Sequence, residues 1–274
     1  MPYPRAHFAL LALVPLIVLA FWPFYFSRLG ASPWTMHVHG LTGTAWILLL
    51  IFQSWAIHNR RIAWHRLAGQ GSLVLFPAFL AGGLLVLHTM ARGLAEEARP
   101  FVMLYGSGLG LVDMLAVGTF AWLYYNALKH RRDVQLHARY MLATPLLLLM
   151  AIFARLFTMA GPLAIRGGED LPRFVGSFHL SAMIVLGIAL ALYAGNRQHG
   201  RAFLVVAVVT GLQSAGFQWV GPLEAWRSLY AGVAGVPLPV TLIVGLAAGA
   251  GIAWAGWRGG GPSQRPQPLV EPAT

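Results

Sequence analysis

"HNRRIAWHRLAG", which runs from His58 to Gly69, is the stretch of sequence that decides the fold. It is rich in arginine and lies between two apolar runs, 35–57 and 66–91. Each run reaches the roughly 20 residues that a membrane-spanning helix needs. A basic turn between two such runs indicates a helical hairpin that leaves the bilayer and returns to it. We therefore expect a membrane protein.

The composition of the whole chain supports this expectation. Apolar residues make up 58% of its 274 positions and charged residues only 10%, far from the roughly 25% charged residues of soluble proteins. The net charge of +11 comes from basic residues dispersed between apolar segments, and a nucleic-acid-binding protein would gather them in one patch or stripe. The chain has no cysteine, which excludes disulfides, thiolate metal sites and cysteine nucleophiles.

Eight segments are long and apolar enough to cross a membrane. They cover residues 7–27, 35–57, 66–91, 101–128, 138–160, 174–195, 202–221 and 236–257. The sequence thus predicts an all-α polytopic bundle with one transmembrane domain, 1–258, and a Gly- and Pro-rich disordered cytoplasmic tail, 259–274. Pro77 and Pro145 are expected to kink their helices.

The distribution of Lys and Arg predicts the orientation of the bundle. Alternate loops collect twelve basic residues on one side and six on the other, and the second side also has five of the eight acidic residues. The positive-inside rule then puts both termini and the opening turn in the cytoplasm, as expected for a bacterial inner-membrane protein. The arginines of these turns are expected to contact anionic lipid head groups.

The opening motif recurs 72 positions later. Without gaps, "HNRRIAWHR" aligns with "HRRDVQLHA", so that His58 meets His130 and His65 meets His137. The pattern predicts two hairpins of the same orientation, helices 2–3 and helices 4–5, related by an axis along the membrane normal. This axis would place His65 and His137 opposite one another. The alternative is that these histidines are interfacial anchors in two unrelated basic turns.

Ionisable residues also lie inside the predicted helices toward the other face, where such groups are expensive and usually have a partner. They are His39, His88, Asp113, Arg155 and His179. One interpretation is structural: Asp113 and Arg155 form a buried ion pair that locks the helices together. The other is a catalytic, proton-relay or metal site that combines His39, His88 and His179 with Asp113 and Arg155.

At "WHRLAG" (64–69) and "LHARYMLATPLLLLMAIFAR" (136–155) the chain resembles a family of bacterial multi-pass membrane proteins with no established activity. Members carry a His-Arg-x-x-Gly turn after an early helix, and later a His-x-Arg-aromatic-Met segment that is followed by an intramembrane Arg. Here the matching stretches are "HRLAG" and "HARYM", within helices 2 to 5. The resemblance implies a fold and no chemistry.

More loosely, the histidines near both faces look like those of diheme b-type membrane cytochromes, which hold each haem between two histidines of different helices. That resemblance implies His65 with His137 at the cytoplasmic side, and two of His39, His88 and His179 at the other. His65 and His137 depart from the pattern, because they lie at the very ends of their helices.

Three classes of function follow, with the first favoured. The first is a protein of membrane electron transfer that binds haem b, with quinone or another redox partner. The second is an enzyme that acts on a lipid through a divalent metal ion held by His39, His88 and His179. The third is a protein without a cofactor: a proton-linked transporter, a sensor or an assembly factor. No nucleic acid is expected as a partner.

Overall fold

The structure is a computed structural model, and it describes residues 2–260. These residues fold into helices without any strand, as predicted. Most of the tail predicted at 259–274 lies outside the described residues. The helices are α1 (Ala6–Phe21), α2 (Trp34–His58), α3 (Ile62–Ala95), α4 (Pro100–Lys129), α5 (Val134–Ala143), α6 (Leu146–Met159), α7 (Arg173–Ala194), α8 (Arg201–Ala215), α9 (Glu224–Gly232) and α10 (Leu238–Gly259). Short 3-10 turns and one π-helical turn, Gly216–Val220, join or extend them.

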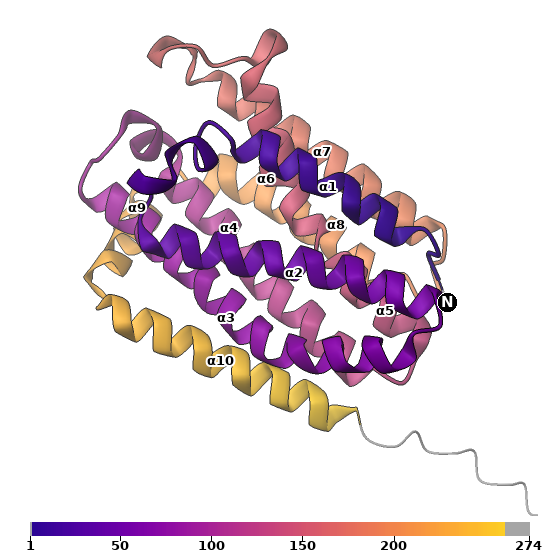
Figure 1. The fold of residues 1–274 in the computed structure, drawn as a ribbon. Helices are drawn as coiled ribbons and strands as arrows, with labels where there is room; N and C mark the ends of the chain where they lie inside the picture. Colours follow the sequence, from indigo (N-terminus) through magenta and orange to yellow (C-terminus); the bar gives the residue numbers. More distant parts are fainter. Residues whose placement is uncertain (1, 261–274) are drawn as a thin grey trace, which may run out of the picture.

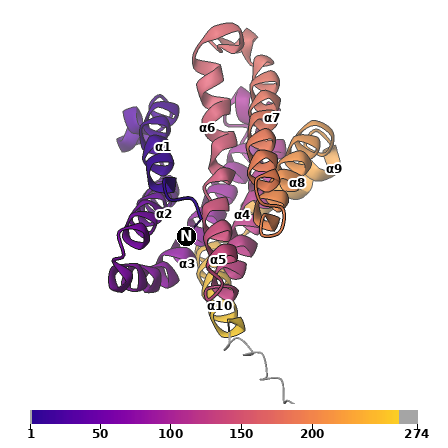
Figure 2. The ribbon, with the colours of Figure 1, turned by 90° about the vertical axis from the view of Figure 1, so that its right-hand side faces the viewer.

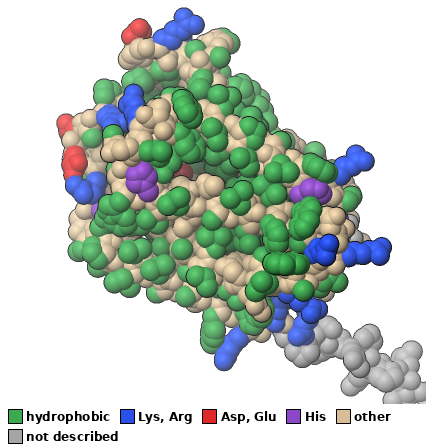
Figure 3. All heavy atoms as spheres, viewed as in Figure 1, with side chains coloured by type: hydrophobic (Ala, Val, Ile, Leu, Met, Phe, Trp, Pro, Cys, Tyr) green, Lys and Arg blue, Asp and Glu red, His purple; other side chains and the backbone are tan. Residues whose placement is uncertain are grey.

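The predicted multi-pass bundle is confirmed. Within the described part of the chain, seven helical segments are long and apolar enough to cross a membrane; α5 with α6 counts as one of them, and α8 with its π-helical turn as another. The segment expected at 7–27 forms α1, which is shorter and ends at Phe21. Pro23 follows two residues later and disfavours a further helical turn, although the same helix contains Pro15. Large apolar side chains such as Val74 and Leu41 are exposed on the surface, and they cover much of the face in Figure 3.

The helices pack in two groups that meet along α4. On one side α3 lies between α2 and α10, and on the other α6 and α7 pack with α8 (Figures 1 and 2). α1 lies along α2 and α6. The interior between α2, α3 and α4 is aromatic, with Trp46, Phe76, Phe120 and Tyr124 in mutual contact.

Proline affects two helices differently. α5 ends at Ala143 and α6 begins at Leu146, so the break predicted at Pro145 is present. The Trp46 indole donates a hydrogen bond to Thr144 Oγ1 at this break (3.0 Å). By contrast, α3 runs through Pro77 as one continuous helix. Gly249 of α10 packs directly on Pro77, where a Cβ would come within 2.5 Å of its Cα.

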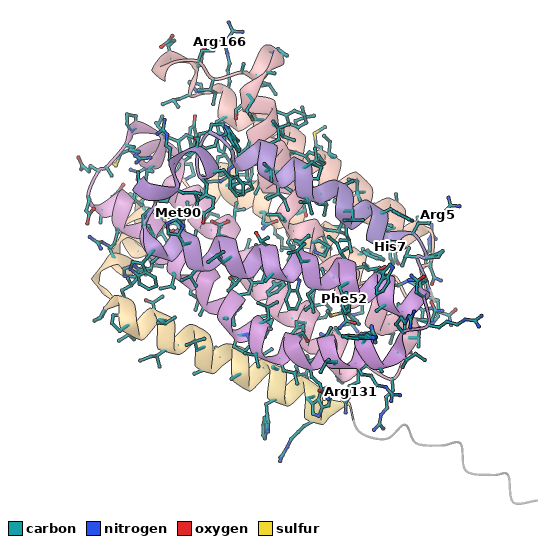
Figure 4. The ribbon with its side chains drawn as sticks, viewed as in Figure 1. Arg5, His7, Phe52, Met90, Arg131 and Arg166 are labelled. Atoms are coloured by element: carbon teal, nitrogen blue, oxygen red, sulfur yellow. The ribbon has the colours of Figure 1, made fainter. Side chains whose placement is uncertain are left out.

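Both ends of the described chain lie at the same end of the bundle (Figure 1). We call it the basic end, because six cations lie in or beside the turns from α2 to α3 and from α4 to α5: Arg60, Arg61, Arg66, Lys129, Arg131 and Arg132. Figure 4 shows Arg5 and His7 at this end with Arg131, and Met90 at the opposite one.

The predicted repeat is visible in the helix boundaries. α3 begins at Ile62 and α5 begins at Val134, 72 positions later, and both start from the basic end. The two copies differ at the residue before the helix. Asp133 caps α5 by accepting hydrogen bonds from the backbone of Gln135 and Leu136, whereas Arg61 makes no such bond.

Candidate functional site

His65 and His137 face one another at the basic end, as the repeat predicted. Each stands in the first turn of its helix, α3 or α5. Their ring centres are 6.4 Å apart and their ring planes are almost perpendicular, at 87°. The hairpins therefore bring together two residues that are distant in sequence.

The two rings have different hydrogen bonds. Nδ1 of His137 donates to the carbonyl oxygen of Ala127 (2.8 Å), at the end of α4. The neutral His137 ring then has its lone pair on Nε2, where it can bind a metal. A backbone carbonyl that holds the other ring nitrogen is the usual support of a metal-binding histidine. His65 has a buried Nδ1 that finds no partner among the described residues.

A cavity of about 470 Å³ opens between the two histidines and α2, within the range of about 300–1,000 Å³ typical of ligand pockets. Its walls include apolar side chains such as Leu50, Ile57, Leu128 and Met141. Its polar lining comprises Gln53, Ser54, His58, His65, Arg66, Gln70, Ser72, Tyr124, Arg131, Arg132 and His137. We call this space the basic-end cavity.

Unpaired polar atoms gather around this cavity. Within the described residues, eight buried side-chain nitrogen or oxygen atoms have no hydrogen-bond partner. Five of them lie here: Gln53 Oε1, Ser54 Oγ, His58 Nε2, His65 Nδ1 and, beside His58, His7 Nδ1. Each such atom costs about 1–3 kcal/mol if nothing binds it. This concentration indicates a site for a ligand.

Hydrogen bonds and ring stacking hold the deeper part of the cavity together. The Ser72 hydroxyl donates to the Gly69 carbonyl and can accept from the Tyr124 hydroxyl, 2.8 Å away. The Tyr124 ring stacks on Phe76 with 4.1 Å between the ring centres. Outer positions are basic. Arg131 donates to the Trp257 carbonyl at the end of α10, while Arg66 and Arg132 are exposed at the rim.

The repeat counterpart of His58 behaves differently. His130 lies outside the cavity lining and stacks on the Tyr140 ring, with 5.8 Å between ring centres and an angle of 11°. Burial lowers the pKa of His130 from its ordinary value, and the neighbouring Lys129 charge acts in the same direction. It packs against an aromatic ring and does not face the cavity.

The structure does not bring His39, His88 and His179 together, contrary to the predicted second site. His88 is buried, and its Nε2 donates to the Val236 carbonyl before α10 (2.8 Å). His179 hydrogen-bonds the Ser214 hydroxyl and the Gln218 side chain of the α8 segment. His39 packs on Phe79. In residues 2–260 no group of three or more His, Asp or Glu side chains is placed to hold a metal ion.

Asp113 and Arg155, predicted to form a buried ion pair, act on one another electrostatically but make no direct contact. No oxygen of Asp113 comes within 4.0 Å of the guanidinium, as judged over the described residues. Instead Arg155 donates to the Ala151 carbonyl of its own helix (3.0 Å) and covers the Phe21 ring of α1 at 4.4 Å. The cation is stabilised by α1, whose position the sequence did not indicate.

A second close pair of histidines was not predicted. His7, in the first turn of α1, and His58, the last residue of α2, have ring centres 6.4 Å apart. His58 belongs to the opening motif, but its partner could be found only by knowing that α1 packs on α2.

No family model, no curated protein and no solved structure matches this chain.

Proposed function

We propose that this chain is a membrane protein of electron transfer that holds one haem in the basic-end cavity, with His65 and His137 as axial ligands. The observation that carries the proposal is the separation of the two rings. A bond between a metal and an imidazole nitrogen is about 2.0–2.1 Å long, which puts the ring centres of two opposed ligands about 6.4 Å apart. In the structure the two ring centres are 6.4 Å apart.

The number of protein ligands favours haem over a divalent metal ion without a macrocycle. A structural or catalytic zinc site uses at least three protein ligands, and within residues 2–260 no third His, Asp or Glu joins this pair. Two histidines suffice when a macrocycle supplies the other four ligands, as in haem. The orientation of His137 by the Ala127 carbonyl raises the basicity of its Nε2 and fixes the ring before binding.

The cavity walls suit a large cofactor that is apolar with an acidic edge. Leu50, Ile57 and Met141 can cover the flat apolar surface. Arg66 and Arg132 at the rim can pair with carboxylates, such as the propionates of haem. The bound group would supply one-electron chemistry, whose potential depends on the axial ligands and on the surrounding polarity.

The proposal differs from a diheme cytochrome, because among residues 2–260 His39, His88 and His179 do not converge on a second haem site at the opposite end. With the basic end in the cytoplasm of a bacterium, the haem would exchange electrons with a donor or acceptor at the cytoplasmic surface. A quinone in the membrane is a second candidate partner. The exposed Arg60 and Arg61 would contact anionic lipids.

The test is a dithionite-reduced minus oxidised absorption spectrum of protein produced with an ample haem supply. We expect the bands of a six-coordinate haem at about one haem per chain. His65→Ala and His137→Ala should each lose them, whereas His130→Ala, the matched control, should keep them. A flat spectrum, or bands that persist in both variants, would contradict the proposal.

A further inference from the structure

His7 and His58 form a pair with the ring separation of the haem-binding pair but with different surroundings. Their ring centres are 6.4 Å apart at an angle of 33°. They come from adjacent antiparallel helices, α1 and α2, which contact one another along their length. Figure 4 shows His7 at the basic end of α1.

The hydrogen bonds of His58 prepare one nitrogen for a ligand. Its Nδ1 donates to the Ser54 carbonyl (2.7 Å), so the neutral ring carries its lone pair on Nε2. That Nε2 is buried and has no partner within the described residues, and the same is true of His7 Nδ1. His58 Nε2 is thus a buried lone pair, and His7 Nδ1 is a second buried nitrogen that carries a lone pair when the ring's proton is on Nε2.

The number and kind of ligands at this pair point to a single ion, and of the two residues His58 also lines the basic-end cavity. Both unpaired nitrogens are closed to solvent, and His7 does not line the basic-end cavity. Zinc would require two further ligands, yet in residues 2–260 no Asp, Glu or third His completes a set here. Imidazole is a suitable ligand for copper, and Cu(I) accepts as few as two ligands.

We propose that His7 and His58 bind one Cu(I) ion between two nitrogen ligands. The carbonyl of Ser54 orients His58, as the carbonyl of Ala127 orients His137, so each pair contains a ring that the backbone holds in place. The ion would have its own two ligands, distinct from those of the proposed haem in the adjoining cavity.

The test is anaerobic titration of the purified full-length protein with Cu(I), against a chromophoric Cu(I) chelator. We expect wild-type protein to retain one equivalent that His7→Phe and His58→Phe each lose. His130→Phe, at the repeat position that corresponds to His58, should retain it. Retention of the full equivalent by both His7→Phe and His58→Phe would overturn the proposal. Loss in His137→Phe but not in His58→Phe would do so too, because the ion would then lie at the other pair.

A second measurement needs no variant. The X-ray absorption edge of the copper-loaded wild-type protein should show the intense pre-edge feature of two-coordinate Cu(I), with nitrogen as the only first-shell scatterer. A three- or four-coordinate edge, or no bound copper at one equivalent, would contradict the proposal. Haem content is measured on the same sample, so that failure of one site is distinguished from failure of the other.

Discussion

The carbonyl oxygen of Ala127, near the end of α4, accepts a hydrogen bond from Nδ1 of His137 at 2.8 Å. This bond joins the two arms of a hairpin across the basic turn that separates them. It also sets which nitrogen of His137 is available to a ligand. The local structure of the turn should therefore affect both stability and ligand binding.

Asp133 is the first test of this coupling. Its carboxylate caps α5 through the backbone of Gln135 and Leu136, at 2.9 and 3.1 Å, one turn before His137. Asp133→Ala should lower the free energy of unfolding by about 0.5–2 kcal/mol and weaken haem binding. Asp133→Asn should stay close to wild type in both, since Asn caps equally well. Equal losses in the two variants, measured by denaturant unfolding and haem titration, would show that charge matters and the cap does not.

Trp46 tests the break between α5 and α6. Trp46→Phe removes the hydrogen bond to Thr144 Oγ1 and leaves a gap among tightly packed aromatic rings. We expect the free energy of unfolding to fall by about 1–3 kcal/mol. Trp55→Phe, on the same helix but 43% exposed, should change it by less than about 0.5 kcal/mol. A Trp46 variant as stable as the Trp55 variant would contradict this packing.

Gly249 tests the contact of α10 with α3. A Cβ at this position would stand 2.5 Å from Pro77 Cα, and the backbone there cannot yield easily. Gly249→Ala should lower the free energy of unfolding by about 1–3 kcal/mol through overpacking. A Cβ at Gly251 would stand in open space. Gly251→Ala should therefore leave the free energy of unfolding unchanged or raise it by up to about 1 kcal/mol. Thermal unfolding of the two variants checks the difference, and the opposite order would place α10 elsewhere.

The topology can be tested directly because the natural chain contains no cysteine. Arg132→Cys lies at the basic end and Glu96→Cys after α3 at the other. A membrane-impermeant maleimide applied to intact cells should label Glu96→Cys only, and should reach Arg132→Cys after permeabilisation. The unmodified chain is the control for background. Labelling of Arg132→Cys in intact cells would reverse the orientation that the basic turns predict.

Much of the fold could be predicted because its signals are local. Apolar length located the helices, Pro145 located a break, and the repeat of His65 at His137 placed two residues opposite one another. Each of these three signals depends on residues that are close in sequence or on the internal repeat. The end of α1 at Phe21 was missed, although Pro23 is a local signal for it.

The predicted cluster of His39, His88 and His179 is not found in the structure. The depth of a residue in the membrane does not determine which neighbouring helix its side chain faces. His88 and His179 lie at similar predicted depths, but they face the chain before α10 and the α8 segment respectively. The packing of Arg155 on Phe21 and the pairing of His7 with His58 depend on where α1 lies. No pattern in one sequence supplies that position.

The most direct test of the central claim is a low-temperature electron paramagnetic resonance spectrum of the oxidised, haem-loaded protein. Each axial imidazole plane splits the iron orbitals along its own direction, and perpendicular planes oppose one another. Because the rings of His65 and His137 stand at 87°, we predict a highly anisotropic low-spin ferric signal that His65→Ala and His137→Ala each abolish. A high-spin signal alone, or a low-spin signal that survives in both variants, would contradict haem ligation by this pair.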